Sequence, residues 1–146
     1  MTIVYPVDPN FGGRPIIIAR IECLLSGKTF LFPMLLDTGA DETCFPGDSA
    51  AFFGHDNDHP KVKKGSCGGI GGHSDKYIHS VQVSLLEPVK MSATNPVIAW
   101  TARYKTASFI KKLNAQFGLI GMDIMREWKS VKFSPNGKGL KIEIVI

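Results

Sequence analysis

The sequence has no long apolar segment, no pattern typical of a secretory signal and only three cysteines. No apolar run approaches the roughly 20 residues that a helix needs to cross a bilayer. The opening stretch, "MTIVYPVDPNFGG", lacks a basic region followed by an apolar one, so we expect no exported leader. Cys23, Cys44 and Cys67 are an odd number at irregular spacing, which fits neither a disulfide framework nor a metal site. These absences predict a protein without membrane attachment, in the cytoplasm, with buried and unreactive thiols.

Charge is only slightly unbalanced, at a net +4 over 146 residues. Lys61, Lys63 and Lys64 form one basic cluster, for which nucleic-acid binding is one interpretation. No aromatic stacking platform or recognition helix accompanies them, so a solvated loop is favoured and no nucleic-acid partner is expected. The four histidines are too scattered for a metal site. We therefore expect no metal and no cofactor.

Length and composition predict one globular domain, residues 1–146, built mostly of β-strands with one or two short helices. A hydrophobic content of 44% and a charged content of 21% are normal for such a domain. Residues 14–25 and 29–36 are rich in β-branched and apolar residues and form a predicted hairpin around a Ser-Gly-Lys turn. Other strands are expected over 75–86, 95–104, 130–134 and 140–146, an amphipathic helix over 106–117, a short helix after Gly121, and loops over 1–13 and 46–64.

The predicted hairpin ends in the tripeptide Asp37-Thr38-Gly39, which is the first feature that suggests chemistry. The tripeptide alone is weak evidence, because about one chain in thirty of this length contains it by chance. Its setting is more informative. The carboxylate follows an aliphatic strand, Thr38 can fix the loop through its hydroxyl, and Gly39 permits a close backbone approach. A plain surface turn after a strand is the alternative interpretation.

A second carboxylate would make this site catalytic. Two carboxylates about 3 Å apart cannot both ionise, so they share one proton. One acts as a base on water while its protonated partner polarises the scissile carbonyl. Because the chain contains a single Asp-Thr-Gly, the second carboxylate must be Asp37 of another copy related by two-fold symmetry. The expected partners are therefore a second identical chain and a peptide or protein substrate.

The segment "LLDTGADETCF" resembles the active-site segment of the retropepsins, the single-domain aspartic proteases of retroviruses and retroelements. Three further segments match this family in the right order: "RPIIIARI" upstream, then "GGIGG" and "GLIGMDIM" downstream. The resemblance covers about residues 14–45, 65–86 and 117–146. It implies a closed β-barrel of the acid-protease type, with a flap hairpin over the site and activity as a homodimeric aspartic endopeptidase.

The resemblance also implies roles for individual residues. It places catalysis at Asp37, Thr38 and Gly39. It implies that substrate-binding residues lie next to this tripeptide, at the flap tip and in the later segment: Ala40, Asp41, Gly69, Ile70, Gly71 and Ile120. The Ile70 amide would hold a water that bridges to the substrate carbonyls. The "LKIEIVI" tail, with the N-terminal segment, would supply strands to the interface between two copies.

Two features depart from the family pattern. Met122 stands where the family commonly carries an arginine that pairs with an acidic residue after the active-site tripeptide, and Arg126 is a candidate replacement. Residues 87–117 form an insertion relative to the compact viral enzymes. These departures motivate an alternative function, a dimerising peptide-binding or regulatory module of the same fold with little or no catalysis. The intact Asp-Thr-Gly argues against it, because a pure binder does not need a desolvated acid pair.

Overall fold

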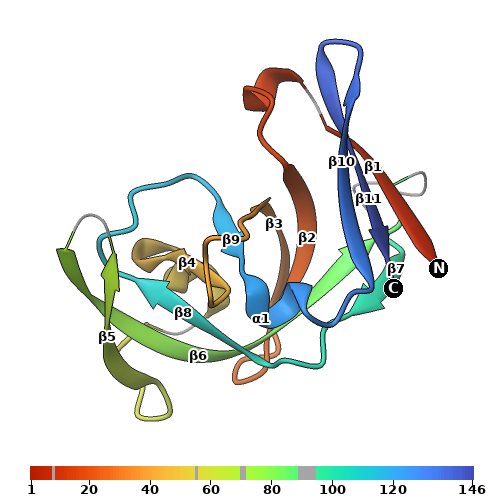
Figure 1. Cartoon of the computed structure of the whole chain (residues 1–146). Coiled ribbons are helices and arrows are strands. Elements are labelled where there is room, and N and C mark those ends of the chain that lie inside the picture. The colour runs from red at the N-terminus through yellow and green to blue at the C-terminus, as the bar shows by residue number, and fades with distance from the viewer. Residues whose placement is uncertain (8, 55, 70–71, 89–94) are drawn as a thin grey trace.

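The computed structural model describes residues 1–7, 9–54, 56–69, 72–88 and 95–146 (Figure 1). The strands in these residues are β1 (Thr2–Val7), β2 (Ile16–Cys23), β3 (Thr29–Leu36), β4 (Cys44–Pro46), β5 (Lys63–Gly69), β6 (Gly72–Leu86), β7 (Ile98–Thr101), β8 (Thr106–Ile110), β9 (Gly118–Ile120), β10 (Ser130–Asn136) and β11 (Gly139–Val145). The helical elements are the 3-10 turns η1 (Pro9–Phe11) and η2 (Gly47–Phe53) and the one-turn helix α1 (Met122–Met125). No helix among these residues is long and apolar enough to cross a membrane.

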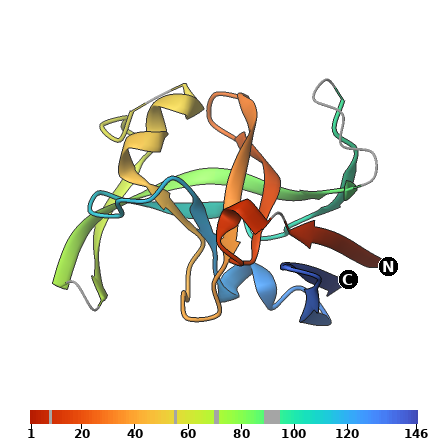
Figure 2. The ribbon, with the colours of Figure 1, turned by 90° about the horizontal axis from the view of Figure 1, so that it is seen from above.

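Six strands close into a barrel in the order β2-β3-β9-β4-β8-β6, and β6 pairs back with β2. The long strand β6 ties the molecule together, because it pairs along its length with β5, β8, β2 and β7. Beyond the barrel, β5 and β6 continue as a hairpin that projects from one end of the molecule (Figures 1 and 2). The expectation of a closed, mostly β barrel is confirmed.

The β2–β3 hairpin forms where the sequence predicts it, and its alternating residues fill the barrel. Ala19, Ile21 and Cys23 are completely buried, and the residues between them are partly exposed, as expected for strands with one face on the core. Pro33 pairs with Ile18 on β2, one residue before β3 begins to pair with β9 at Met34. Pro33 has no N–H to donate. Its position is compatible with this, because β3 pairs there with β2 alone and has no partner yet on its other side.

A second, three-stranded sheet of β1, β11 and β10 lies at the end of the molecule opposite the β5–β6 hairpin, together with both termini (Figures 1 and 2). The predicted hairpin over 130–146 is confirmed. The prediction of a loop at the N-terminus is wrong, because Thr2–Val7 is a strand whose alternate residues are buried. Its Tyr5 hydroxyl donates to the Leu86 carbonyl at 2.7 Å and attaches this sheet to the barrel. Burial raises the pKa of Tyr5 despite that bond.

The amphipathic helix expected over residues 106–117 is absent. Thr106–Ile110 instead forms strand β8 inside the barrel, between β4 and β6. The helical spacing of apolar residues in this segment is fortuitous, because Ala107, Ser108 and Phe109 are consecutive and all buried. Continuous burial is typical of a strand that is covered on both faces and paired on both edges. One short strand of the insertion, Thr106–Ile110, is thus part of the barrel, whereas β7 pairs with β6 outside it.

Aromatic side chains fill the barrel around β8. The Phe109 ring stacks on Phe45 at a centroid distance of 5.1 Å and meets Phe53 edge-on at 4.9 Å. All three side chains are completely buried. Phe52, next to Phe53 on η2, is instead 65% exposed. The two neighbouring phenylalanines therefore differ sharply in how much apolar surface folding removes from water.

Replacing Phe109 by alanine is expected to lower the free energy of unfolding by about 3–5 kcal/mol, since it leaves a cavity in this aromatic cluster. The matched substitution Phe52→Ala, at an exposed position, is expected to cost less than about 1 kcal/mol. Urea unfolding followed by tryptophan fluorescence measures both. Equal losses for the two variants would contradict the assigned packing.

Candidate active site

The Asp37 loop begins where β3 leaves the barrel, and backbone hydrogen bonds hold its start. The Leu36 amide donates to the Pro15 carbonyl at 3.0 Å, and the Asp37 amide donates to the Ile120 carbonyl at 3.1 Å. The Asp37 carboxylate accepts the Gly39 amide through Oδ1 at 2.9 Å. Asp37 is half-buried, whereas Thr38 and Gly39 are exposed. The loop therefore holds its carboxylate at the surface of a rigid barrel, which is where a reacting group must be.

The junction of β9 and α1 lies directly against the far side of this loop. The Met122 amide donates to the Ala40 carbonyl at 2.8 Å, and the Asp123 amide donates to the Asp41 carbonyl at 3.1 Å. A Cβ at Gly121 would lie only 2.5 Å from the Glu42 carbonyl carbon, so only glycine fits at this position. Close backbone contact thus fixes the loop from Ala40 to Glu42.

Asp123 adds a side-chain brace to the same loop. Its two carboxylate oxygens accept the Thr43 amide and the Thr43 hydroxyl, each at 2.7 Å. The Thr43 hydroxyl also accepts the Gly121 amide at 3.2 Å, and Thr43 is completely buried. Arg126, the candidate replacement for the missing arginine, is exposed and has no ion pair among the described residues. A carboxylate and backbone amides, rather than an arginine, hold the loop of this chain.

Glu42 links the loop to the sheet beside it. Both of its carboxylate oxygens lie 3.1 Å from the Lys76 ammonium on β6, and Oε2 accepts the Ser108 hydroxyl on β8 at 2.8 Å. The Ser108 hydrogen bond, and then the Lys76 charge, lower the pKa of Glu42 against the opposing effect of partial burial. The carboxylate is therefore stabilised in its charged form.

The glycine-rich segment lies at the tip of the β5–β6 hairpin. Strand β5 ends at Gly69, which pairs with Gly72 at the start of β6. Two predicted substrate-binding residues, Ile70 and Gly71, lie outside the described residues. The stem below the tip is attached to the turn that follows β8. The Lys112 ammonium donates to the His73 carbonyl at 2.9 Å, and the Lys112 amide donates to the Ser74 hydroxyl at 3.0 Å.

Ile120 and Asp41 occupy contrasting positions beside the loop. Ile120 is completely buried, and its carbonyl receives the Asp37 amide, so it supports the loop from the core. Asp41 is exposed and Ala40 is half-buried. The structure thus brings Asp37, Ala40, Asp41 and Ile120 together around one loop.

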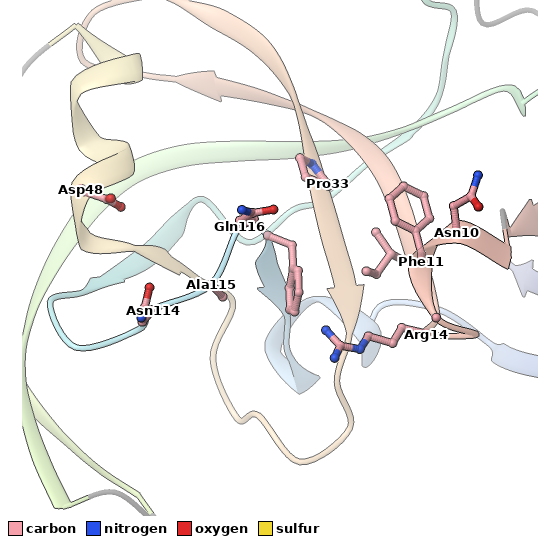
Figure 3. Close-up of a pocket in the computed structure, with 11 residues that line it drawn as sticks. Asn10, Phe11, Arg14, Pro33, Asp48, Asn114, Ala115 and Gln116 are labelled. Carbon is pink, nitrogen blue, oxygen red and sulfur yellow. The ribbon is translucent and has the colours of Figure 1, made fainter.

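An open pocket of about 850 Å³ lies beside the strands that lead to Asp37 (Figure 3). Asp48 and Asn114 border it on one side and Phe11 and Asn10 on the other. The Arg14 guanidinium lies 5.7 Å from the centre of the Phe117 ring, within the range of a cation–π contact. The pocket is not lined by Asp37 itself, but Arg14 precedes Pro15, whose carbonyl accepts the Leu36 amide just before Asp37.

The three cysteines are free thiols; Cys23 and Cys44 are buried as predicted, whereas Cys67 is only partly buried, so the prediction is wrong for that thiol. Burial, followed by the charge of nearby Cys67 and of neighbouring carboxylates, raises the pKa of Cys44 to about 12. Its thiol therefore stays protonated and unreactive near neutral pH. No group of three or more histidine, cysteine, aspartate or glutamate side chains in the described part of the chain is arranged to hold a metal ion.

Sequence reasoning missed the bracing residues of this site, Thr43, Asp123 and the pair of Glu42 with Lys76. Thr43 and Asp123 are 80 residues apart, and Glu42 and Lys76 are 34 apart, so only the folded barrel brings each pair together. One signal was present in the sequence. Thr43 and Asp123 lie within "LLDTGADETCF" and "GLIGMDIM", two of the segments that carry the resemblance.

Replacing Thr43 by valine is expected to lower the free energy of unfolding by about 1–3 kcal/mol, the cost of leaving a buried donor unsatisfied. The change replaces the hydroxyl by a methyl group and leaves the buried Gly121 amide without its acceptor, while Asp123 Oδ1 loses one hydrogen bond and keeps that of the Ile124 amide. Thr43→Ser retains the hydroxyl and is expected to cost much less. Chemical unfolding of both variants measures the difference, and an equal loss for the two would exclude the hydroxyl as the cause.

Glu42 is expected to contribute to stability in a pH-dependent way. Folding lowers the pKa of Glu42 below its ordinary value of 4.5. The charged carboxylate therefore stabilises the folded protein fully above pH 4.5, and this stabilisation is lost as the pH falls through the lower pKa of the folded state. The advantage of wild type over Glu42→Gln should therefore shrink between about pH 5 and pH 3. Since the side chain is 49% exposed, the effect is expected to be below about 1 kcal/mol. Urea unfolding at several pH values measures it, and a constant difference would contradict the assignment.

Comparison with known proteins identifies the fold but not the family. No family model and no curated protein matches the sequence. Among solved structures, a retropepsin-like aspartic protease from Rickettsia conorii matches with a TM-score of 0.56 and 16% identity, over 99% of this chain and 91% of that one. EIAV protease, complexed with the inhibitor HBY-793, matches with a TM-score of 0.47 and 19% identity, over 83% of this chain and 93% of that one. The chain therefore has the fold of the retropepsin-like aspartic proteases.

Proposed function

We propose that this protein is an aspartic endopeptidase that acts as a homodimer. The observation that carries the proposal is the position of Asp37-Thr38-Gly39. In a barrel with the retropepsin-like fold, this tripeptide lies on a loop held by the Ile120 carbonyl and packed against Gly121. Asp37 and its counterpart share one proton, and one of them activates water while the other polarises the scissile carbonyl. The Gly39 amide, which donates to Asp37 Oδ1, orients that carboxylate, whereas the expected anchoring by the Thr38 hydroxyl is absent, since Thr38 is exposed and its side chain has no hydrogen bond among the described residues.

The proposed catalyst needs a second chain, because each chain supplies one Asp37. Residues 1–146 form one half of the active unit. The three-stranded sheet supports this association, since in the described residues β1 and β10 each pair only with β11. Strands with an unpaired edge readily pair with another chain. The "LKIEIVI" tail itself forms the central strand β11, so an interface would use its neighbours β1 and β10 rather than the tail.

The proposed substrate is an extended peptide, bound between the Asp37 loop and the β5–β6 hairpin acting as a flap. Ala40, Asp41 and Gly69, together with Ile70 and Gly71, would contact its backbone, with Ile120 supporting the loop from below. The pocket beside Arg14 and Phe117, at about 850 Å³, is in the size range of small-molecule pockets and is large enough for several residues of a peptide. We place the enzyme in the cytoplasm, on the basis of its odd and irregularly spaced cysteines. No metal or cofactor takes part in the proposed reaction.

One of the two arguments for the alternative function, a non-catalytic binding module, is weakened by the structure. That alternative rested partly on the missing arginine at Met122. The contacts of Asp123 with Thr43, and of Met122 with Ala40, brace the loop without an arginine. Catalysis therefore remains compatible with the departure from the family pattern.

Replacing Asp37 by asparagine is expected to abolish peptide cleavage, with a loss of at least about 100-fold, because a neutral amide cannot act as the base. A mixed peptide library incubated between about pH 3 and pH 8, with products identified by mass, is the measurement. The exposed Asp58→Asn variant is the control and is expected to retain full activity. Cuts that persist in Asp37→Asn, or no cuts from dimeric wild type, would overturn the proposal.

The shared site predicts a second result from mixtures of the two proteins. Adding an equal amount of Asp37→Asn to a fixed amount of wild type is expected to reduce activity to about half after subunit exchange, because mixed dimers are inactive. A catalyst complete within one chain would keep its full activity. The rate of peptide cleavage over time separates the two outcomes.

A further inference from the structure

The contact between Glu42 and Lys76 joins two parts of the site that are separate in the sequence. Glu42 lies five residues after Asp37 on the loop, and Lys76 lies four residues after Gly72 on the β5–β6 hairpin. The ammonium lies 3.1 Å from each carboxylate oxygen. Ser108 on β8 donates to the same carboxylate at 2.8 Å. The Asp37 loop and two strands of the sheet, β6 and β8, thus meet at one charged group.

The loop end of this contact is rigid because of the Glu42 backbone. Its carbonyl group lies so close to Gly121 that a Cβ there would come within 2.6 Å of the carbonyl oxygen. The residue before Gly121, Ile120, receives the Asp37 amide through its carbonyl. The catalytic residue and Glu42 are therefore held by two consecutive residues of the β9–α1 junction. A short chain of contacts fixes the Glu42 side chain relative to Asp37.

The hairpin end of the contact is also fixed. The Lys76 side chain is only 16% exposed, although it is charged. Its aliphatic part lies across the partner strand, where a Cβ at Gly65 would be 3.4 Å from the Lys76 Cε. Lys76 pairs in register with Gly65 on β5 and with Ile110 on β8. A contact to Lys76 therefore acts on both strands of the hairpin.

We propose that Glu42 is a positioning residue that, through Lys76, sets the height of the β5–β6 hairpin relative to Asp37 and thereby controls substrate affinity. This inference rests on the proposed function, in which the hairpin covers the bound peptide. The contact does not involve the Asp37 carboxylate and acts on the stem of the hairpin, so it governs closure over the peptide rather than the proton transfers at Asp37. Lys112, bound to His73 and Ser74, holds the hairpin nearer Gly72 and, among the described residues, has no hydrogen bond to the Asp37 loop.

Lys76→Met retains the apolar part of the side chain and removes the ammonium group. It is expected to raise KM for an extended peptide by about three- to tenfold, the size of one partly screened charged hydrogen bond, while kcat changes less than about twofold. In a protein that already carries Glu42→Gln, Lys76→Met is expected to raise KM by less than it does in wild type, because the two residues act through one contact. Lys64→Met is the matched control. It lies on the same hairpin, pairs with Asp58 at 3.5 Å, and is 65% exposed.

Hydrogen exchange tests the same contact without catalysis. In Lys76→Met, the amides of Lys63–Gly69 are expected to exchange about three- to tenfold faster, with the amides of β2 and β3 unchanged. Lys64→Met should leave both sets unchanged. If Lys76→Met speeds exchange but the wild-type protein cleaves no peptide, the structural role of the contact is supported and the proposed function is refuted. Unchanged exchange, or an unchanged KM in an active enzyme, would overturn the positioning role and leave the proposed function intact.

Discussion

The packing of the Asp37 loop on the β9–α1 junction is the constraint on which the candidate site depends. At Gly121 the two backbones approach so closely that no side chain fits between them. This approach allows the Ile120 carbonyl to receive the Asp37 amide, and the Ala40 carbonyl to receive the Met122 amide. Asp123 then reaches Thr43 on the far side of the loop. One glycine thus permits a set of hydrogen bonds that holds a carboxylate at the barrel surface.

Local patterns in the sequence were sufficient to predict most of the hairpins and the two segments that meet at the site. The β2–β3 and β10–β11 hairpins combine β-rich strands with short turns, so both could be predicted from neighbouring residues. Strand β8 could not, because its continuous burial comes from pairing with β4 and β6, which are distant in sequence. Strand β1 was missed for a similar reason, since its partner β11 is at the other end of the chain. Pairing between remote segments overrides local periodicity in both cases.

The position of the candidate site could be predicted from the sequence, but the contacts that support it could not. Asp37, Thr38 and Gly39 were recognised from one short segment, and the structure places them at the end of a barrel strand. The supporting contacts involve residue types that occur on any surface, a threonine, a glutamate and a lysine. Their function depends on partners that only folding supplies. The substitution of Met122 for a family arginine therefore has a simple physical explanation, because backbone amides and Asp123 hold the loop instead.

The closed barrel has a consequence for a protein proposed to cut peptides, since its own chain is always present as a competing substrate. Peptides bind such an enzyme as extended strands, and an extended strand is available only when its edges are unpaired. The six barrel strands have neighbours on both sides, and β11 lies between β1 and β10. These segments would have to unfold before they could enter an active site. Under the proposed function, closure of the barrel would therefore protect these strands from cleavage by another copy, with the same hydrogen bonds that make the fold.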